Sequence, residues 1–122
     1  MAWLIELDRA VQEWLDSLDA ATYKAVMAAV VVLSREGPSL GRPLVDTITG
    51  SRIANLKELR PPAPGRQAIR MLFAFDPARA AFFLVGGDKS GDWDQWYRRN
   101  LPLAEQRYEK HLRELEKRKE PR

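Results

Sequence analysis

The residues best suited to chemistry form a basic cluster in the middle of the chain, where Lys57, Arg60, Arg66 and Arg70 accompany a single acid, Glu58. The Pro- and Gly-rich turn at 61–65 predicts a hairpin that carries these residues on two paired strands. Guanidinium groups bind phosphate oxygens bidentately and stay charged at cellular pH, which suits binding and transition-state stabilisation at a phosphodiester. The alternative is an edge hairpin that its charges keep soluble.

Two further residues near the cluster have potential chemical roles. Lys89 follows a predicted strand across Gly86-Gly87, and a lysine on such a loop can reach over the sheet. The surrounding segment lacks the glycine spacing and the following helix of a phosphate loop, so nucleotide binding is not predicted. Glu58 is expected to orient the neighbouring basic side chains by ion pairing, with a general-base role as the alternative.

Aromatic and basic side chains alternate in the next segment, which holds Trp93, Trp96 and Tyr97 followed by Arg98 and Arg99. Such rings stack on unpaired bases while arginines contact the flanking phosphates, as in proteins that bind single-stranded RNA. The i, i+3 spacing of the tryptophans is also typical of a short helix that buries one face, so a core or lid role stays open for them. Tyr97, with its polar end, is the better candidate for a site.

The residue inventory excludes several enzyme classes. The absence of Cys excludes a disulfide framework, a thiol nucleophile, an iron–sulfur cluster and a cysteine-based zinc site. A catalytic triad or a His-based metal cluster would depend on the single histidine, His111, which could otherwise act as a general acid or base or lie buried in a structural role. We therefore expect neither a metal nor a cofactor.

The positive charge is concentrated in the second half of the chain. Residues 1–55 hold 5 Lys and Arg against 7 Asp and Glu, whereas residues 56–122 hold 15 against 10, which together give the net charge of +3. This asymmetry favours a polyanionic partner, with nucleic acid as the first candidate, although solvated helix faces produce similar counts.

The elements that must position these residues are predicted from hydrophobic periodicity and turn signals. Residues 2–7 predict a strand that leads to a helix capped by Asp8, and Asp19 caps a second helix that ends at Gly37-Pro38. An antiparallel meander follows, with strands at 53–60, 66–75 and 80–85. A last helix opens near Pro102 and continues to Leu115.

The order of these elements predicts an α+β protein. A length of 122 residues suits one domain over 1–122, with residues 116–122 frayed. The longest apolar run, Ala25–Leu33, has nine residues and is too short to span a bilayer, and no targeting segment precedes it. A cytoplasmic location without membrane contact is therefore expected.

The segment Leu56-Lys57-Glu58-Leu59-Arg60, the arginine-bearing strand that follows it and Lys89 resemble the RelE/HigB-like toxins of bacterial type II toxin–antitoxin systems, in their phage-derived HigB-like branch. The resemblance covers nearly the whole chain and is strongest at Leu56–Arg60 with Arg70. It implies a RelE-like fold, with an N-terminal strand and helical hairpin packed on a small, mainly antiparallel sheet and a C-terminal helix.

The resemblance also implies an endoribonuclease, or mRNA interferase, that usually cuts mRNA on the ribosome and inhibits translation. In such enzymes the ribose 2′-hydroxyl attacks the adjacent phosphate, which gives a cyclic phosphate and a 5′-hydroxyl end without a metal or a protein nucleophile. By position, Arg70 matches the family's strand arginine at the scissile phosphate, and Lys89 falls where a basic residue is expected beyond the last strand. The residue patterns and the resemblance together predict two sets of residues: catalytic Arg70, Lys89, Lys57 and Tyr97, and RNA-binding Arg60, Arg66, Arg98, Arg99 and Trp96.

The chain departs from the family pattern because it has no His on the sheet or beside Tyr97. Tyr97 or Lys89 would then have to assist the proton transfers, or the ribosome would supply part of the site. Two alternatives remain open: a ParE-like inhibitor of DNA gyrase, which shares the fold, and a non-catalytic RNA-binding module. The implied partners are an antitoxin of the helix-turn-helix type encoded by an adjacent gene, the ribosome with its mRNA, and operator DNA through the toxin–antitoxin complex.

Overall fold

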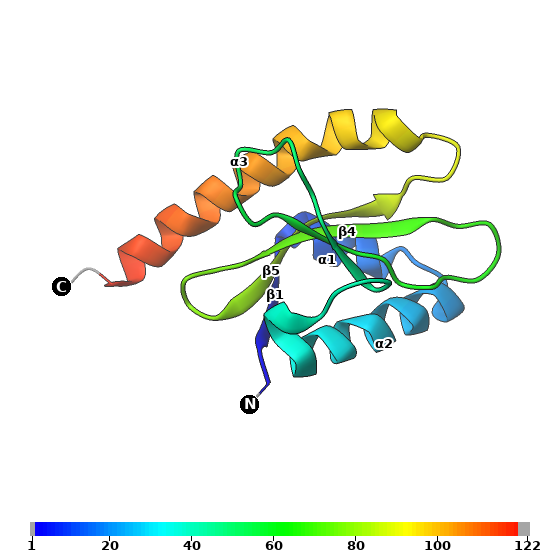
Figure 1. The fold of residues 1–122 in the computed structure, drawn as a ribbon, viewed down its shortest axis with the longest axis horizontal. Coiled ribbons are helices and arrows are strands. Elements are labelled where there is room, and N and C mark those ends of the chain that lie inside the picture. Colours follow the sequence, from blue (N-terminus) through cyan, green and yellow to red (C-terminus); the bar gives the residue numbers. More distant parts are fainter. Residues whose placement is uncertain (1, 120–122) are drawn as a thin grey trace.

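A five-stranded sheet forms the centre of the structure, a computed structural model that describes residues 2–119 (Figure 1). The strand order is β1-β5-β4-β3-β2, and only the β1–β5 pair among the described strands is parallel. The strands are β1 (Leu4–Leu7), β2 (Val45–Thr47), β3 (Lys57–Leu59), β4 (Ile69–Phe75) and β5 (Ala80–Asp88), and the helices are α1 (Arg9–Asp16), α2 (Ala20–Glu36), a 3-10 turn η1 (Gly37–Ser39) and α3 (Trp93–Lys119). The predicted α+β class with a mainly antiparallel sheet and a C-terminal helix is confirmed.

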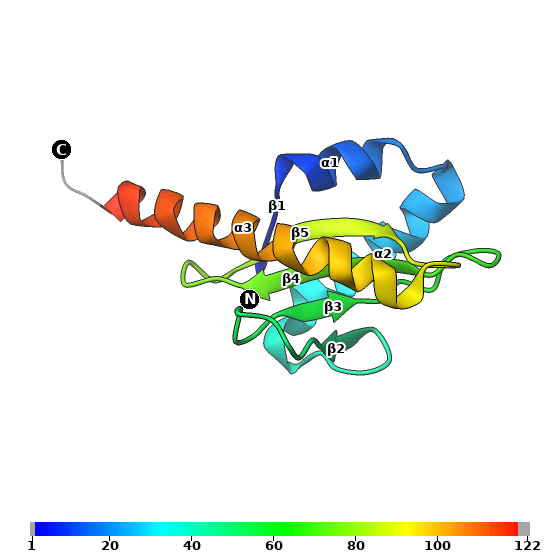
Figure 2. The same ribbon diagram turned by 90° about the horizontal axis from the view of Figure 1, so that it is seen from above.

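The helices cover both faces of the sheet, and the alternation of residues along β4 explains why. Ile69, Met71 and Phe73 point to one face, where they form a buried core with α1 and α2. Leu72 and Ala74 point to the other face, and Leu72 packs in a second core beneath α3. Figure 1 shows α2 and α3 on opposite sides of the sheet, and Figure 2 shows α3 running at a shallow angle to the strands, with its C-terminal turns extending past them. None of the described helices is long and apolar enough to cross a membrane.

The predicted helix caps are confirmed. The Asp8 carboxylate accepts a hydrogen bond from the Ala10 amide at 2.9 Å, and Asp19 accepts one from the Thr22 amide at 2.7 Å. Such bonds satisfy amides that have no partner inside the helix. Gly37 ends α2 with a φ of 63°, a conformation that favours glycine. These local signals fix the helical hairpin against the sheet.

Two predicted boundaries are wrong. The strand expected over 53–60 forms only at Lys57–Leu59, because the preceding turn is tied to α3 by Glu105, which accepts from the Arg52 amide at 2.8 Å. The last helix begins at Trp93 rather than near Pro102, which lies inside α3. Burial of Trp96 favours helix at this end, and the Asn100 side chain adds a 2.8 Å hydrogen bond to the Trp96 carbonyl. The helix continues through residues 116–119, and the remaining positions of the expected frayed end, 120–122, lie outside the described residues.

A close contact between α1 and β5 gives a test of the packing. A Cβ atom added at Gly86 would lie 2.4 Å from Cε3 of the Trp14 ring, whereas one added at Gly41 would meet no atom within 4 Å. We expect Gly86→Ala to lower the free energy of unfolding by about 1–3 kcal/mol, because the indole must shift to make room. Gly41→Ala, the matched control, should change it by less than about 0.5 kcal/mol in urea denaturation. Equal effects of the two substitutions would contradict this packing.

Candidate active site

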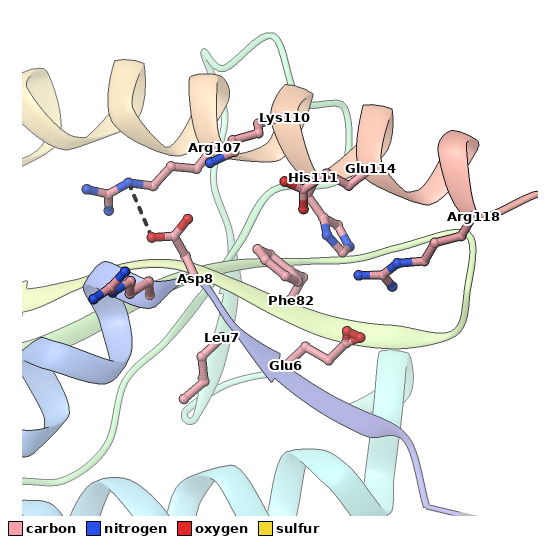
Figure 3. Close-up of a pocket in the computed structure, with 10 residues that line it drawn as sticks. Glu6, Leu7, Asp8, Phe82, Arg107, Lys110, His111, Glu114 and Arg118 are labelled. Carbon is pink, nitrogen blue, oxygen red and sulfur yellow. Dashed lines mark ion pairs between the residues drawn. The ribbon is translucent and has the colours of Figure 1, made fainter.

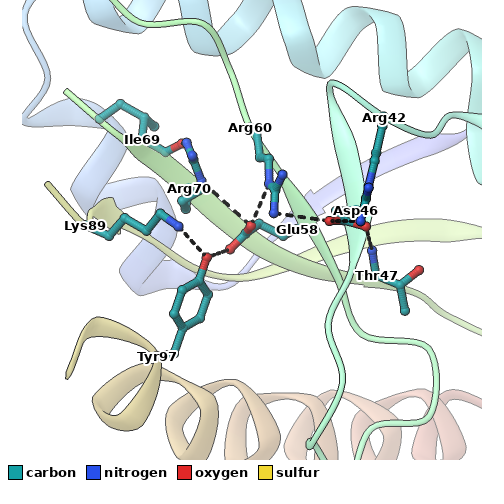
Figure 4. A network of polar contacts seen from close by, with 9 residues as sticks. All are labelled: Arg42, Asp46, Thr47, Glu58, Arg60, Ile69, Arg70, Lys89 and Tyr97. Carbon is teal, nitrogen blue, oxygen red and sulfur yellow. Dashed lines mark hydrogen bonds and ion pairs between the residues drawn. The ribbon is translucent and has the colours of Figure 1, made fainter. Parts of the chain in front are cut away.

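A buried carboxylate, Glu58, lies at the centre of a polar network between the sheet and α3 (Figure 4). One of its oxygens accepts a 2.9 Å hydrogen bond from Nε of Arg60 and lies 3.7 Å from Nε of Arg70. The other oxygen accepts a hydrogen bond from the Tyr97 hydroxyl. A fully buried carboxylate needs such compensation, and these contacts fix Arg60, Arg70 and Tyr97 around Glu58, in agreement with its predicted orienting role.

The strand geometry brings these side chains to one face of the sheet. Glu58 is opposite Leu72 of β4 in the antiparallel register, and Leu72 belongs to the core beneath α3. Arg60 follows two residues after Glu58 and Arg70 precedes Leu72 by two, so both share this face. Tyr97 reaches the same carboxylate from the second turn of α3.

Arg60 is held from two sides by carboxylates. Besides its bond to Glu58, its guanidinium contacts Oδ2 of Asp46 at 3.2 Å, and Arg42 contacts the same oxygen at 3.2 Å. Asp46 stands opposite Glu58 in the pairing of β2 with β3. The hydrogen bond to Glu58 raises the pKa of Arg60, and the hydrogen bond from Arg42 lowers the pKa of Asp46. Asp46 could not be predicted as part of the site, since a three-residue edge strand in a loop-rich segment gives no signal of its long-range pairing.

Lys89 and Tyr97 form the other side of the network. The Lys89 ammonium donates a 3.1 Å hydrogen bond to the Tyr97 hydroxyl oxygen, and its side chain is buried. Burial, helped by the charge of Arg70, lowers the pKa of Lys89, which makes its ammonium a better proton donor. Burial raises the pKa of Tyr97, and the hydrogen bond to Glu58 raises it further, so the hydroxyl stays protonated at neutral pH.

Arg70 has unused hydrogen-bonding capacity at the centre of the cluster. Its Nη1 donates to the carbonyl of Ile69 at 2.8 Å, but its buried Nε has no hydrogen-bond partner among the described residues. The side chain keeps 18% of its surface exposed, and that of Arg60 keeps 34%. The four cationic side chains here, Arg42, Arg60, Arg70 and Lys89, outnumber the two carboxylates, Glu58 and Asp46, and this excess of positive charge suits a phosphate.

The structure brings together four of the predicted site residues: Arg60, Arg70, Lys89 and Tyr97. Lys57 does not join them, because it alternates with Glu58 along β3 and so belongs to the face that carries Leu59 and the α2 core. The structure therefore does not group Lys57 with these side chains, and its catalytic role stays a prediction.

Among the described residues, none of the remaining predicted RNA contacts pairs with Glu58. Arg66 is exposed in the loop between β3 and β4, Arg98 is exposed on α3, and exposed Arg99 pairs with Asp92. Trp96 is only 4% exposed and packs in the core beneath α3, so the prediction that its ring stacks on RNA is wrong. Its alternative, a core role, is what the structure shows.

His111 has a structural position far along α3 from the Glu58 network. Its Nε2 atom lies 2.6 Å from the Asp76 carboxylate, and its ring stacks on Phe82 at a centroid distance of 3.6 Å. It borders a groove of about 480 Å³ between β1 and α3, in which Asp8 and Arg107 form an ion pair (Figure 3). The groove mixes acidic and basic side chains and shares no residue with the Glu58 network. Within residues 2–119, no three His, Asp or Glu side chains gather as metal ligands.

The hydroxyl of Tyr97 gives a focused test of the network. We expect Tyr97→Phe to lower the free energy of unfolding by about 1–3 kcal/mol, because buried Glu58 loses a donor and Lys89 loses its acceptor. Tyr23→Phe, which removes an exposed hydroxyl on α2, is the control and should be neutral. Urea denaturation of both variants measures the difference, and a neutral Tyr97→Phe would show that the network contributes little to stability.

Comparison with known proteins agrees with this architecture. The model of the family described as "Phage derived protein Gp49-like (DUF891)" matches residues 13–109. The chain is 48% identical over 116 residues to the Mycobacterium tuberculosis (strain ATCC 25618 / H37Rv) protein "Putative toxin HigB2", covering 95% of this chain and 57% of that protein. It is also 48% identical over 102 residues to "Putative toxin HigB3" of the same strain, covering 84% of this chain and 87% of that protein.

A solved structure supports the fold independently of close sequence similarity. The E. coli toxin RelE, determined as a double mutant in the free state, superimposes with a TM-score of 0.58 at 12% identity. The match covers 75% of this chain and 88% of RelE. The chain spans little more than half the length of HigB2 but most of HigB3. The chain therefore belongs to the phage-derived Gp49-like family, has HigB2 and HigB3 as relatives, and shares the fold of RelE.

Proposed function

We propose that this protein is the toxin of a type II toxin–antitoxin pair and that it cleaves mRNA on the ribosome. The observation that carries the proposal is the arrangement of Arg60, Arg70, Lys89 and Tyr97 around Glu58 on one face of the sheet. Support also comes from the relatives HigB2 and HigB3, which are described as toxins. A cognate antitoxin of the helix-turn-helix type belongs to the proposal, and operator DNA would be bound through the complex.

The cluster suits cleavage by attack of the ribose 2′-hydroxyl on the neighbouring phosphorus. The new bond joins the 2′-oxygen to phosphorus while the bond to the 5′-oxygen breaks, so charge builds on the phosphate oxygens. Arg70 and Arg60 stabilise that charge, since their guanidinium groups are fixed by Glu58 and are partly exposed. No metal enters this step.

The proton transfers are divided between the protein and the ribosome in this proposal. Lys89, whose pKa is lowered by burial, protonates the departing 5′-oxygen, and Tyr97 positions its ammonium. Glu58 is a poor base for the 2′-hydroxyl because it is fully buried and both of its oxygens already accept hydrogen bonds. We therefore assign the removal of the 2′-hydroxyl proton to a group that the ribosome supplies.

The proposal is tested by inducing the protein in cells and mapping new 5′ ends of mRNA, with and without a block on translation. We expect new ends within coding regions that disappear when translation is blocked. Ends that persist under the block would contradict dependence on the ribosome. DNA damage without new mRNA ends would indicate a ParE-like gyrase inhibitor. The absence of both DNA damage and new mRNA ends would indicate a non-catalytic RNA-binding module.

A further inference from the structure

One tryptophan beside the cluster is exposed rather than buried. Trp93 is the first residue of α3 and has 58% of its surface accessible, in contrast to the 4% of Trp96. An exposed indole is a large apolar surface, and packing within the described chain does not account for it. The side chains that contact Trp93 therefore indicate what this exposed ring could bind.

Trp93 is linked to the cluster through Lys89. The Lys89 ammonium lies 4.5 Å from the centroid of the Trp93 ring and 4.9 Å from that of Tyr97. Trp93 and Tyr97 are one helical turn apart on α3, so the ammonium lies against both rings on the same side of the helix. The cation covers one face of the indole, and 58% of the Trp93 surface stays accessible beside it.

We propose that Trp93 is a stacking subsite for an unpaired nucleobase of single-stranded RNA, next to a phosphate bound by Lys89 and Arg70. An indole offers a face on which any base can stack, and a cation beside it contacts the flanking phosphate. A base paired in a duplex has no free face for such a contact, so the subsite selects single strands. That this RNA is a substrate rests on the proposed function, but stacking of a base on Trp93 does not require cleavage.

The test measures binding of a single-stranded oligoribonucleotide of ten residues that carries 2′-O-methyl groups throughout, so that it has no attacking hydroxyl. We expect Trp93→Ala to weaken its affinity about tenfold in fluorescence anisotropy, and Trp93→Phe to retain most of it, because a phenyl ring also stacks. Leu103→Ala, which truncates another exposed apolar side chain of α3, is the matched control and should bind as the unchanged protein does. A duplex of the same sequence should bind equally to the unchanged protein and to Trp93→Ala.

Three results would overturn the subsite. Trp93→Ala could bind the single strand as tightly as the unchanged protein does, or it could lose as much affinity for the duplex as for the single strand. The third result is that the unchanged protein does not bind the single strand. If Trp93→Ala abolishes growth arrest in cells but binds the oligoribonucleotide as tightly as the unchanged protein does, the exposed ring is assigned to a protein contact instead. Failure of the proposed function gives a different result from failure of the subsite. A protein that binds the single strand through Trp93 but cuts no mRNA would have the stacking subsite and would not be a nuclease.

Discussion

Replacement of Arg70 by alanine is expected to lower the rate of mRNA cleavage at least about 100-fold while the protein stays folded. Arg70 contributes a partly exposed guanidinium beside Glu58, so its loss removes a proposed phosphate ligand. Glu58 retains its hydrogen bonds from Arg60 and Tyr97, which limits the structural damage. The measurement is the appearance of cut mRNA after induction, with circular dichroism to verify the fold.

Arg35→Ala is the matched control for this experiment. It removes the same charge from an exposed position in the last turn of α2, which covers the opposite face of the sheet. We expect nearly unchanged cleavage from it. Arg70→Lys should fall between the two, because an ammonium keeps the charge but not the bidentate geometry. A folded Arg70→Ala protein that still cuts mRNA and arrests growth would remove Arg70 from the active site.

Replacement of Glu58 by alanine is expected to have the largest effect on stability, a loss of about 3–5 kcal/mol in the free energy of unfolding. Glu58 is fully buried, and its carboxylate is the shared partner of Arg60, Arg70 and Tyr97. Without it, two guanidinium groups face each other with only Asp46 near one of them. Urea denaturation at constant pH and salt measures the loss.

Glu13→Ala provides the comparison, because Glu13 forms an ion pair with Arg9 on the exposed side of α1. Exposed pairs of this kind contribute little, so its loss should be below about 0.5 kcal/mol. Glu58→Gln should lie between the two, since an amide retains the acceptor but not the charge. A Glu58→Ala protein as stable as Glu13→Ala would show that the buried carboxylate does not hold the cluster together.

The basic cluster could be predicted from sequence because hairpin pairing brings residues on neighbouring strands together. Lys57 falls outside the cluster for a simple reason: residues next to each other on a strand point to opposite faces, so Lys57 and Glu58 lie on different faces of the sheet. The error at Trp96 arose because helical spacing places a residue on a face but does not say what covers it. Here the ring packs against Gly87, where a Cβ would lie 2.7 Å from its Nε1 atom.

The network around Arg60 could not be predicted in full. Asp46 reaches Arg60 only because β2 pairs with β3, and three residues carry too little pattern to reveal a pairing between distant segments. The start of α3 could not be predicted either, because it depends on tertiary packing. Pro102 is a strong signal for a helix start, yet packing of Trp96 and Tyr97 beneath the helix extends α3 nine residues before it.

The chemistry of the RNA ends tests the central claim most directly. Purified protein is incubated with ribosomes translating a defined mRNA, and both ends at each cut are characterised. We predict a 5′-hydroxyl on one fragment and a 2′,3′-cyclic phosphate on the other, with no cleavage when the mapped cut site carries a single 2′-deoxy residue. Fragments with 5′-phosphate ends, or equal cleavage of the 2′-deoxy mRNA, would contradict attack by the 2′-hydroxyl at a site built from Arg60, Arg70, Lys89 and Tyr97.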